Sequence, residues 1–228
     1  MIVGIGSNAG YFSGGPLGVA SIWGAAVALA VWMFRRTSGA HFNPAITLAL
    51  IAKGAAPASE FAPYTFAQCF GALAASVACA FGRTRTLGAA VTLPAPVVAL
   101  SSEVCVTSVL VVCVFAIGEG VQRGRLPYTT APAVVGLVIT ALNLVFSHLA
   151  VGLNPAIALG GRLADALLSV DVFRPSWILD MASAPLVGPL LGALLGVYLF
   201  RAPSTIHRSA NGDFLCNVPI RSTTNSNS

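Results

Sequence analysis

Asn43-Pro44-Ala45 and its repeat Asn154-Pro155-Ala156 decide the fold of this chain. Asparagine is a preferred helix N-cap and proline is favoured at the first helical position, so each triplet predicts the abrupt start of a helix. The helices that follow, expected over 44–52 and 155–163, have about nine residues each, whereas a helix that crosses a bilayer needs about 20. One such short helix in each half of the chain indicates a pore or binding site built at membrane depth.

The composition indicates that lipid is the solvent for most of the chain. Of the 228 residues, 56% are hydrophobic and 8% are charged, whereas a soluble domain carries about 25% charged residues. Five apolar runs are long enough to cross a membrane: 16–34, 61–81, 98–117, 131–150 and 178–200. We therefore predict an all-α, multi-pass integral membrane protein, in either the plasma membrane or an internal one.

Several other functions are excluded by charge and cysteine usage. The basic residues behind the net charge of +5 cluster in particular loops, so we expect no nucleic-acid partner. The five cysteines include no CxxC pair and four of them lie in the apolar runs, which is typical of small residues at helix interfaces and not of a metal site. With no nucleophile–base pair and no glycine-rich phosphate loop, we expect no enzyme activity, no cofactor and no metal.

The two halves of the chain repeat one pattern. The segment 40–46 precedes the segment 151–157 by 111 residues, and Gly71-Ala72 after the first triplet matches Gly192-Ala193 after the second. The second half is predicted to consist of two spans, a half-helix and a further span. Because the number of full spans is odd, the two copies insert in opposite orientations, which is an inverted repeat.

The first half contains one span fewer than the second. Glu103, in the run 98–117, lies 51 residues before Asn154, and the same count back from Asn43 falls before Met1. We therefore expect about five full spans where the repeat calls for six, with most of the first transmembrane helix lacking.

The motifs together resemble the major intrinsic protein family, which comprises the aquaporins and the glycerol-conducting aquaglyceroporins. The matching segments are 38–45, 67–68, 71–72, Glu103, 152–156, 161–163, Pro185 and 188–193. The resemblance implies an aquaporin-like inverted-repeat bundle over residues 1–201, embedded in a lipid bilayer and assembled as a homotetramer with one pore per subunit. The remaining residues, 202–228, are polar and rich in Ser, Asn and Thr, which predicts a disordered tail.

The resemblance implies that the two half-helices meet end to end in mid-membrane. Asn43 and Asn154 would cap their own helices and donate amide hydrogens to a passing water or hydroxyl oxygen, although a plain capping role is the alternative. Two facing helix N-termini place about half a positive charge each near the centre, which repels cations and protons.

A selectivity filter of four positions is also implied by the resemblance, one of them an Arg directly after the second triplet. Trp23, Val151 and Ile157 align with three of these positions, and Ile157 occupies that of the Arg. The fourth is Leu142 when no gap is allowed, which we prefer, or Asn143 when the count starts from Gly136.

An apolar filter without the Arg predicts weaker selectivity for water and passage of small neutral solutes such as glycerol, urea or ammonia. Arg offers five donors and a fixed charge, and Ile offers neither. Trp23 supports this reading, because a Trp at the matching position of aquaglyceroporins packs against the carbons of glycerol. Ala158 argues against it, because those relatives usually carry Asp there.

Two residues are expected to support the loops. The resemblance implies that Glu103 holds backbone groups of the second Asn-Pro-Ala loop, the alternative being a protonated Glu that faces lipid. His41 is expected to orient the first loop, the alternative being a titrating switch. The function expected is a passive channel for water or small neutral solutes; the alternative is a non-conducting, truncated or regulatory member of the same family.

Overall fold

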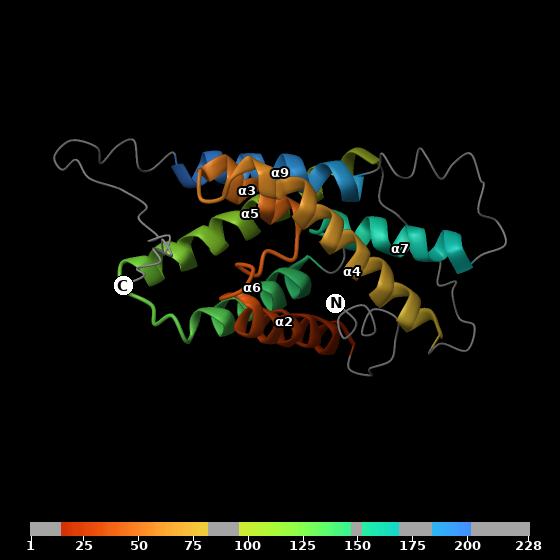
Figure 1. Cartoon of the computed structure of the whole chain (residues 1–228), viewed down its shortest axis with the longest axis horizontal. Helices are drawn as coiled ribbons and strands as arrows, with labels where there is room; N and C mark the ends of the chain where they lie inside the picture. Colours follow the sequence, from red (N-terminus) through yellow and green to blue (C-terminus); the bar gives the residue numbers. More distant parts are fainter. Residues whose placement is uncertain (1–14, 82–95, 147–151, 169–183, 202–228) are drawn as a thin grey trace, which may run out of the picture.

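The computed structural model describes residues 15–81, 96–146, 152–168 and 184–201, and within these ranges the regular structure is entirely helical. Figure 1 shows the helices: α2 (Gly15–Phe34), α3 (Pro44–Lys53), the 3-10 helix η1 (Ala58–Glu60), α4 (Phe61–Phe81), α5 (Pro96–Gln122), α6 (Ala131–Val145), α7 (Pro155–Leu168) and α9 (Ala184–Arg201). The predictions on the chain start, on Val151 and on the tail 202–228 lie outside the described residues.

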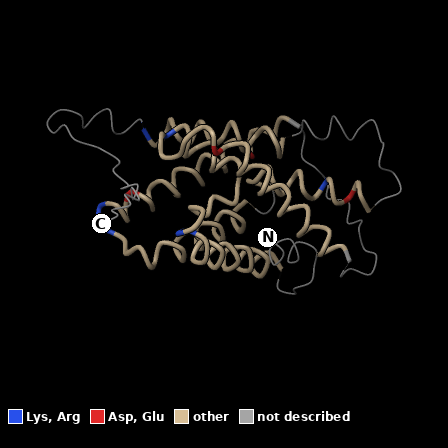
Figure 2. Tube along the Cα trace, in the orientation of Figure 1, with Lys and Arg blue, Asp and Glu red and all other residues tan. Residues whose placement is uncertain are grey.

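The long helices carry the predicted spans. Gly15–Phe34, Val97–Gln122 and Ala184–Arg201 are each long and apolar enough to cross a membrane, and α4 has the length of a span with 21 residues. Figure 2 shows that the charged residues lie mostly near helix ends, which leaves long stretches of the helices uncharged. The prediction of an all-α membrane fold is therefore confirmed for the described residues.

The first half-helix, α3, begins at the predicted residue and ends one residue later than predicted. Asn43 has an extended backbone and its side chain accepts a hydrogen bond from the Ala45 amide, while Pro44 occupies the first turn. The helix ends at Lys53, and the next residue, Gly54, has a φ of 83° in the left-handed region, a conformation that glycine adopts without a steric penalty. This ending lies one residue beyond the predicted limit at Ala52.

The second half-helix, α7, is longer than predicted. It runs to Leu168 and has 14 residues, so the predicted end at Leu163 is wrong. The five residues that follow Leu163, Ala164 to Leu168, include no glycine or proline. Ala and Leu are strong helix formers, so the helix continues. The two half-helices are therefore unequal in length although their starts are alike.

Small residues bring the long helices into close contact. α5 packs along α9, α2 along α6, α4 along α7, and α3 beside α9 (Figure 1). On α9, a Cβ at Gly188 would lie 2.5 Å from the Glu103 Cβ, and one at Gly192 would lie 2.5 Å from the Val104 carbonyl oxygen. Helices in lipid associate through such close backbone approach, so these glycines fix the position of α5 against α9.

The buried core lies where α3, α5, α6 and α9 meet. Its members include Ala45, Val106, Leu142, Leu153 and Val197. Because residues from both triplet loops belong to one cluster, the two halves of the repeat share a core and place their half-helices against each other.

Candidate functional site

The two triplet asparagines hold the opposite loops. Asn43 Nδ2 donates to the Leu153 carbonyl at 2.7 Å, and Asn154 Nδ2 donates to the Phe42 carbonyl at 2.9 Å. Each Asn also caps its own helix, with Oδ1 accepting from the amide of Ala45 or Ala156 at 2.9 and 3.0 Å. The two half-helices therefore start side by side and are joined by a reciprocal pair of hydrogen bonds.

This exchange changes what the asparagines offer to a solute. A side-chain amide has two N–H donors, and one donor of each Asn is used on the opposite loop. Asn43 is buried, with 6% of its surface exposed, whereas Asn154 is partly exposed and lines a cavity. The second N–H of Asn154 can therefore make the expected hydrogen bond to a passing oxygen more readily than the buried Asn43 can.

The residue before each asparagine has a left-handed backbone. Phe42 has a φ of 51° and Leu153 a φ of 55°, a region that bulky residues rarely occupy and that costs about 1–3 kcal/mol. Phe42 and Leu153 are also the residues whose carbonyl oxygens accept hydrogen bonds from Asn154 and Asn43. Backbone strain is therefore present at the two loop positions that join the halves.

Glu103 binds the second loop. Its side chain is 2% exposed, and its two oxygens accept from the amides of Gly152 at 2.6 Å and of Leu153 at 3.0 Å. A buried carboxylate is costly unless it is hydrogen-bonded, and two amide donors supply that compensation. Glu103 lies inside the protein and faces the loop, in the arrangement that the resemblance implies.

His41 belongs to a polar network that fixes the first loop. Its Nδ1 lies 3.3 Å from Thr47 Oγ1, which donates to the Asn43 carbonyl at 3.2 Å and accepts from Gln68 Nε2 at 3.2 Å. The His41 ring also lies against that of Tyr64, with centroids 4.6 Å apart. Thr47 Oγ1 is thus shared by the His41 ring, the Gln68 amide and the Asn43 carbonyl, which ties the first loop to α3 and α4.

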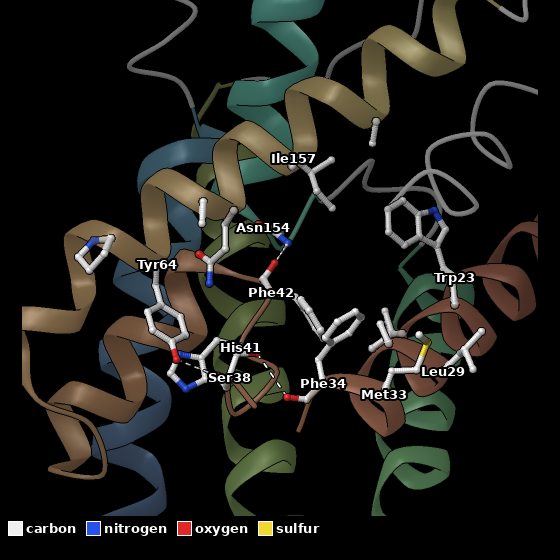
Figure 3. Close-up of a pocket in the computed structure, with 18 residues that line it drawn as sticks. Trp23, Leu29, Met33, Phe34, Ser38, His41, Phe42, Tyr64, Asn154 and Ile157 are labelled. Atoms are coloured by element: carbon white, nitrogen blue, oxygen red, sulfur yellow. Dashed lines mark hydrogen bonds between the residues drawn. The ribbon is translucent and has the colours of Figure 1, made fainter. Parts of the chain in front are cut away.

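A cavity of about 860 Å³ lies between α2, α4 and the two loops. Trp23 enters it from α2 and Ile157 from α7, while Asn154, Phe42 and His41 border it on the loop side (Figure 3). Further lining residues on α2 are apolar and include Val27, Ala30 and Met33. The cavity thus has an apolar wall along α2 and its polar groups on the loops and α4.

Of the other two predicted filter positions, one lies away from the cavity and one lies outside the described residues. Leu142 is 7% exposed and belongs to the buried core and not to the cavity lining. Its neighbour Asn143 donates to the Ile139 carbonyl of its own helix at 2.8 Å. Val151 lies outside the described residues. Among the described residues, the structure therefore brings together Trp23 and Ile157 of the expected filter.

Sequence reasoning missed the side chains that hold the first loop. Thr47, Tyr64 and Gln68 carry the contacts around His41, and the Tyr64 hydroxyl donates to the Ser38 carbonyl at 3.0 Å. Thr47 and Gln68 are isolated polar residues in apolar helices, which was the signal available for them. Within the described part of the chain there is no group of three or more His, Cys, Asp or Glu residues that could hold a metal.

Comparisons with known proteins agree with this geometry. The model of the major intrinsic protein family matches residues 2–200. A probable glycerol uptake facilitator protein of Thermotoga maritima is 31% identical over 202 residues, which cover 78% of this chain and 80% of that one. A probable aquaporin of Archaeoglobus fulgidus is 29% identical over 210 residues, covering 87% and 80%. The crystal structure of the aquaglyceroporin from Plasmodium falciparum has the same fold, with a TM-score of 0.73 at 24% identity over 88% of this chain and 89% of that one.

Two short helices that start side by side inside an apolar bundle define a membrane channel with an inverted repeat. The chain belongs to the major intrinsic protein family. It is therefore a multi-pass integral membrane protein of a family of channels for water or small solutes, which agrees with the prediction that it is not an enzyme.

Proposed function

We propose that this chain is a passive channel whose filter is apolar and admits small neutral solutes, with glycerol and urea as the first candidates and ammonia and water beside them. One observation carries the proposal: Trp23 and Ile157 line the same cavity as Asn154. An indole, an aliphatic side chain and an amide donor are thus available to one solute. The relatives named as glycerol facilitators support this class of solute.

The apolar wall along α2 determines which solutes keep most of their favourable contacts inside the cavity. Water that passes Ile157 loses hydrogen bonds that an Arg would have replaced. A polyol presents carbons to the wall and hydroxyls to the loops, so it loses fewer contacts than water. The same absence of a fixed charge leaves cation exclusion to the two helix N-termini.

Flux measurements with reconstituted liposomes test the proposal. Stopped-flow light scattering in gradients of an impermeant sugar, glycerol and urea gives the three permeabilities, with empty liposomes as the baseline. We expect glycerol and urea permeation well above that baseline. Fast water flow without glycerol or urea permeation would contradict the apolar filter, and no flux of any solute would favour the non-conducting alternative.

A matched pair of variants shows whether solutes use the described cavity. Ala30 lines the cavity, whereas Ala25, on the same helix, is exposed and not among the lining residues. Ala30→Trp is expected to reduce glycerol flux at least several-fold, and Ala25→Trp is expected to leave it unchanged. Equal fluxes in the two variants would place the solute path elsewhere.

A homotetramer is part of the same proposal. Exposed leucines and aromatic residues on α2, α4 and α9, such as Trp32, Phe66 and Tyr198, provide apolar surface for lipid or for neighbouring subunits. Light scattering of the detergent-solubilised protein gives its mass, and a monomeric mass in every mild detergent would contradict the tetramer.

A further inference from the structure

The C-terminal end of α3 carries a cation held between two aromatic rings. The Lys53 ammonium lies 4.2 Å from the centroid of the Phe115 ring and 4.7 Å from that of Phe200. The two rings are themselves 5.4 Å apart and nearly perpendicular. Phe115 is 3% exposed, so the aromatic faces hold the charge beside the protein core and restrict its movement toward water.

A second cation reaches the same helix end. The Arg201 guanidinium donates to the Ala52 carbonyl at 2.8 Å, one of the carbonyls that the end of a helix leaves without a partner. The C-terminus of a helix carries about half a negative charge. Lys53 and Arg201 together therefore more than offset the negative pole of α3.

The other half-helix has the opposite arrangement. α7 has no basic residue in its last turn, and Asp165 lies there as an exposed carboxylate. The positive N-termini of α3 and α7 meet at the site. Among the described residues, two basic groups lie at the far end of α3, whereas α7 has Arg162 within the helix and Asp165 in its last turn. The two half-helices therefore place their charges at different distances from the site.

We propose that Lys53, clasped by Phe115 and Phe200, is a specificity-determining residue that raises the barrier to cations at the Asn43–Asn154 site. It acts through α3 and touches no solute. The helix has 10 residues, which spans about 15 Å. At that distance, with an effective dielectric constant of about 20–40, one charge changes the occupancy of a cation at the site roughly two- to six-fold. The charge of Lys53 matters for cation exclusion because Ile157 supplies no charge to the filter. This inference rests on the proposed function.

Proton and potassium leak through reconstituted liposomes tests the role of the charge. Lys53→Met keeps the length of the side chain and removes its charge, and Lys53→Arg keeps the charge. We expect a roughly two- to six-fold larger cation leak for Lys53→Met, an unchanged glycerol flux, and wild-type leak for Lys53→Arg. An unchanged leak with a lower melting temperature would make Lys53 a structural anchor only and would overturn the proposal.

Asp165→Asn provides the mirror control. It removes a negative charge from the far end of α7, so the leak is expected to fall, by a smaller factor because Asp165 is exposed. A rise in leak for this variant would contradict the electrostatic mechanism.

Phe115→Leu keeps the Lys53 charge and loosens the clasp, and it remains informative if Lys53→Met does not fold. A wild-type leak in Phe115→Leu would show that the aromatic faces do not hold the charge in place, against the proposal.

A wild-type chain that conducts no neutral solute would contradict the proposed function, whereas an unchanged leak in Lys53→Met contradicts this inference alone.

Discussion

The side chain of Asn154 donates to the backbone carbonyl of Phe42, 112 residues earlier in the chain, at 2.9 Å. Its counterpart Asn43 makes the same contact with Leu153 in the opposite direction. Each half-helix is therefore held at its start by the loop of the other repeat. The position of the remaining amide donor on Asn154 depends on both halves at once.

Replacing Asn154 is expected to destabilise the protein as well as the site. Asn154→Ala removes a helix cap, which costs about 1 kcal/mol, and leaves the Phe42 carbonyl without its partner, which costs about 1–3 kcal/mol. Unfolding in mixed detergent micelles measures the sum. Asn143→Ala is the control, because the Asn143 amide bonds only within its own helix; a loss there as large as that of Asn154→Ala would contradict the special role of the cross-loop bond.

Glu103→Gln is expected to weaken the second loop. The substitution removes the charge and replaces one of two acceptors by an NH₂ group that faces an amide donor, at a cost of about 1.5–3 kcal/mol. We expect a lower free energy of unfolding together with lower solute flux. Ser108→Ala on the same helix removes only a hydroxyl that bonds to the Cys105 carbonyl, so it should leave the flux at the wild-type value. Wild-type flux in Glu103→Gln would show that the loop keeps its shape without the carboxylate.

Ile157→Arg is expected to narrow the range of solutes. The guanidinium would add five donors and a fixed charge to the cavity, so glycerol and urea permeation should fall relative to water and cation leak should decrease. Ile157→Met, which is apolar and of similar size, separates the effect of charge from that of shape. If both variants conduct glycerol as the wild type does, Ile157 does not face the solute.

Ala40→Gly is expected to stabilise the first loop. Ala40 has a φ of 53°, which costs an L-residue about 1 kcal/mol and costs glycine nothing comparable. Because glycine also gives the unfolded chain more freedom, we expect a gain of at most about 0.5 kcal/mol. Ala25→Gly, at an exposed position within α2, should instead lose about 0.5–1 kcal/mol, so a loss in both variants would contradict the strain at Ala40.

Much of the fold follows from local chemistry that a sequence displays. Asn43 with Pro44 marks a helix start, Gly54 marks its end, and apolar runs of about 20 residues mark spans. The length of α7 was predicted wrongly, because the prediction set its end by analogy with α3, whereas the residues from Ala164 to Leu168 include helix formers and no Gly or Pro that would end the helix.

The site is less predictable than the fold for a physical reason. The left-handed backbone at Phe42 and Leu153 opposes the preference of both residues. Tertiary hydrogen bonds offset this cost: Asn154 binds the Phe42 carbonyl, and Asn43 and Glu103 bind Leu153. The direction in which the Leu142 side chain points depends on the rotation of its helix. An alignment error of one residue changes this direction by about 100°. Family resemblance supplied Glu103 and His41, whereas the contact of Gln68 with Thr47 is seen only when α3 and α4 are packed together.

Gly188 has no side chain and no contact with the cavity, yet the shape of the second loop depends on it. A methyl group there would lie 2.5 Å from the Cβ of Glu103 and would push α5 away from α9, carrying the carboxylate away from Gly152 and Leu153. A single added carbon at Gly188 would thereby loosen the second triplet loop from a helix that does not line the cavity.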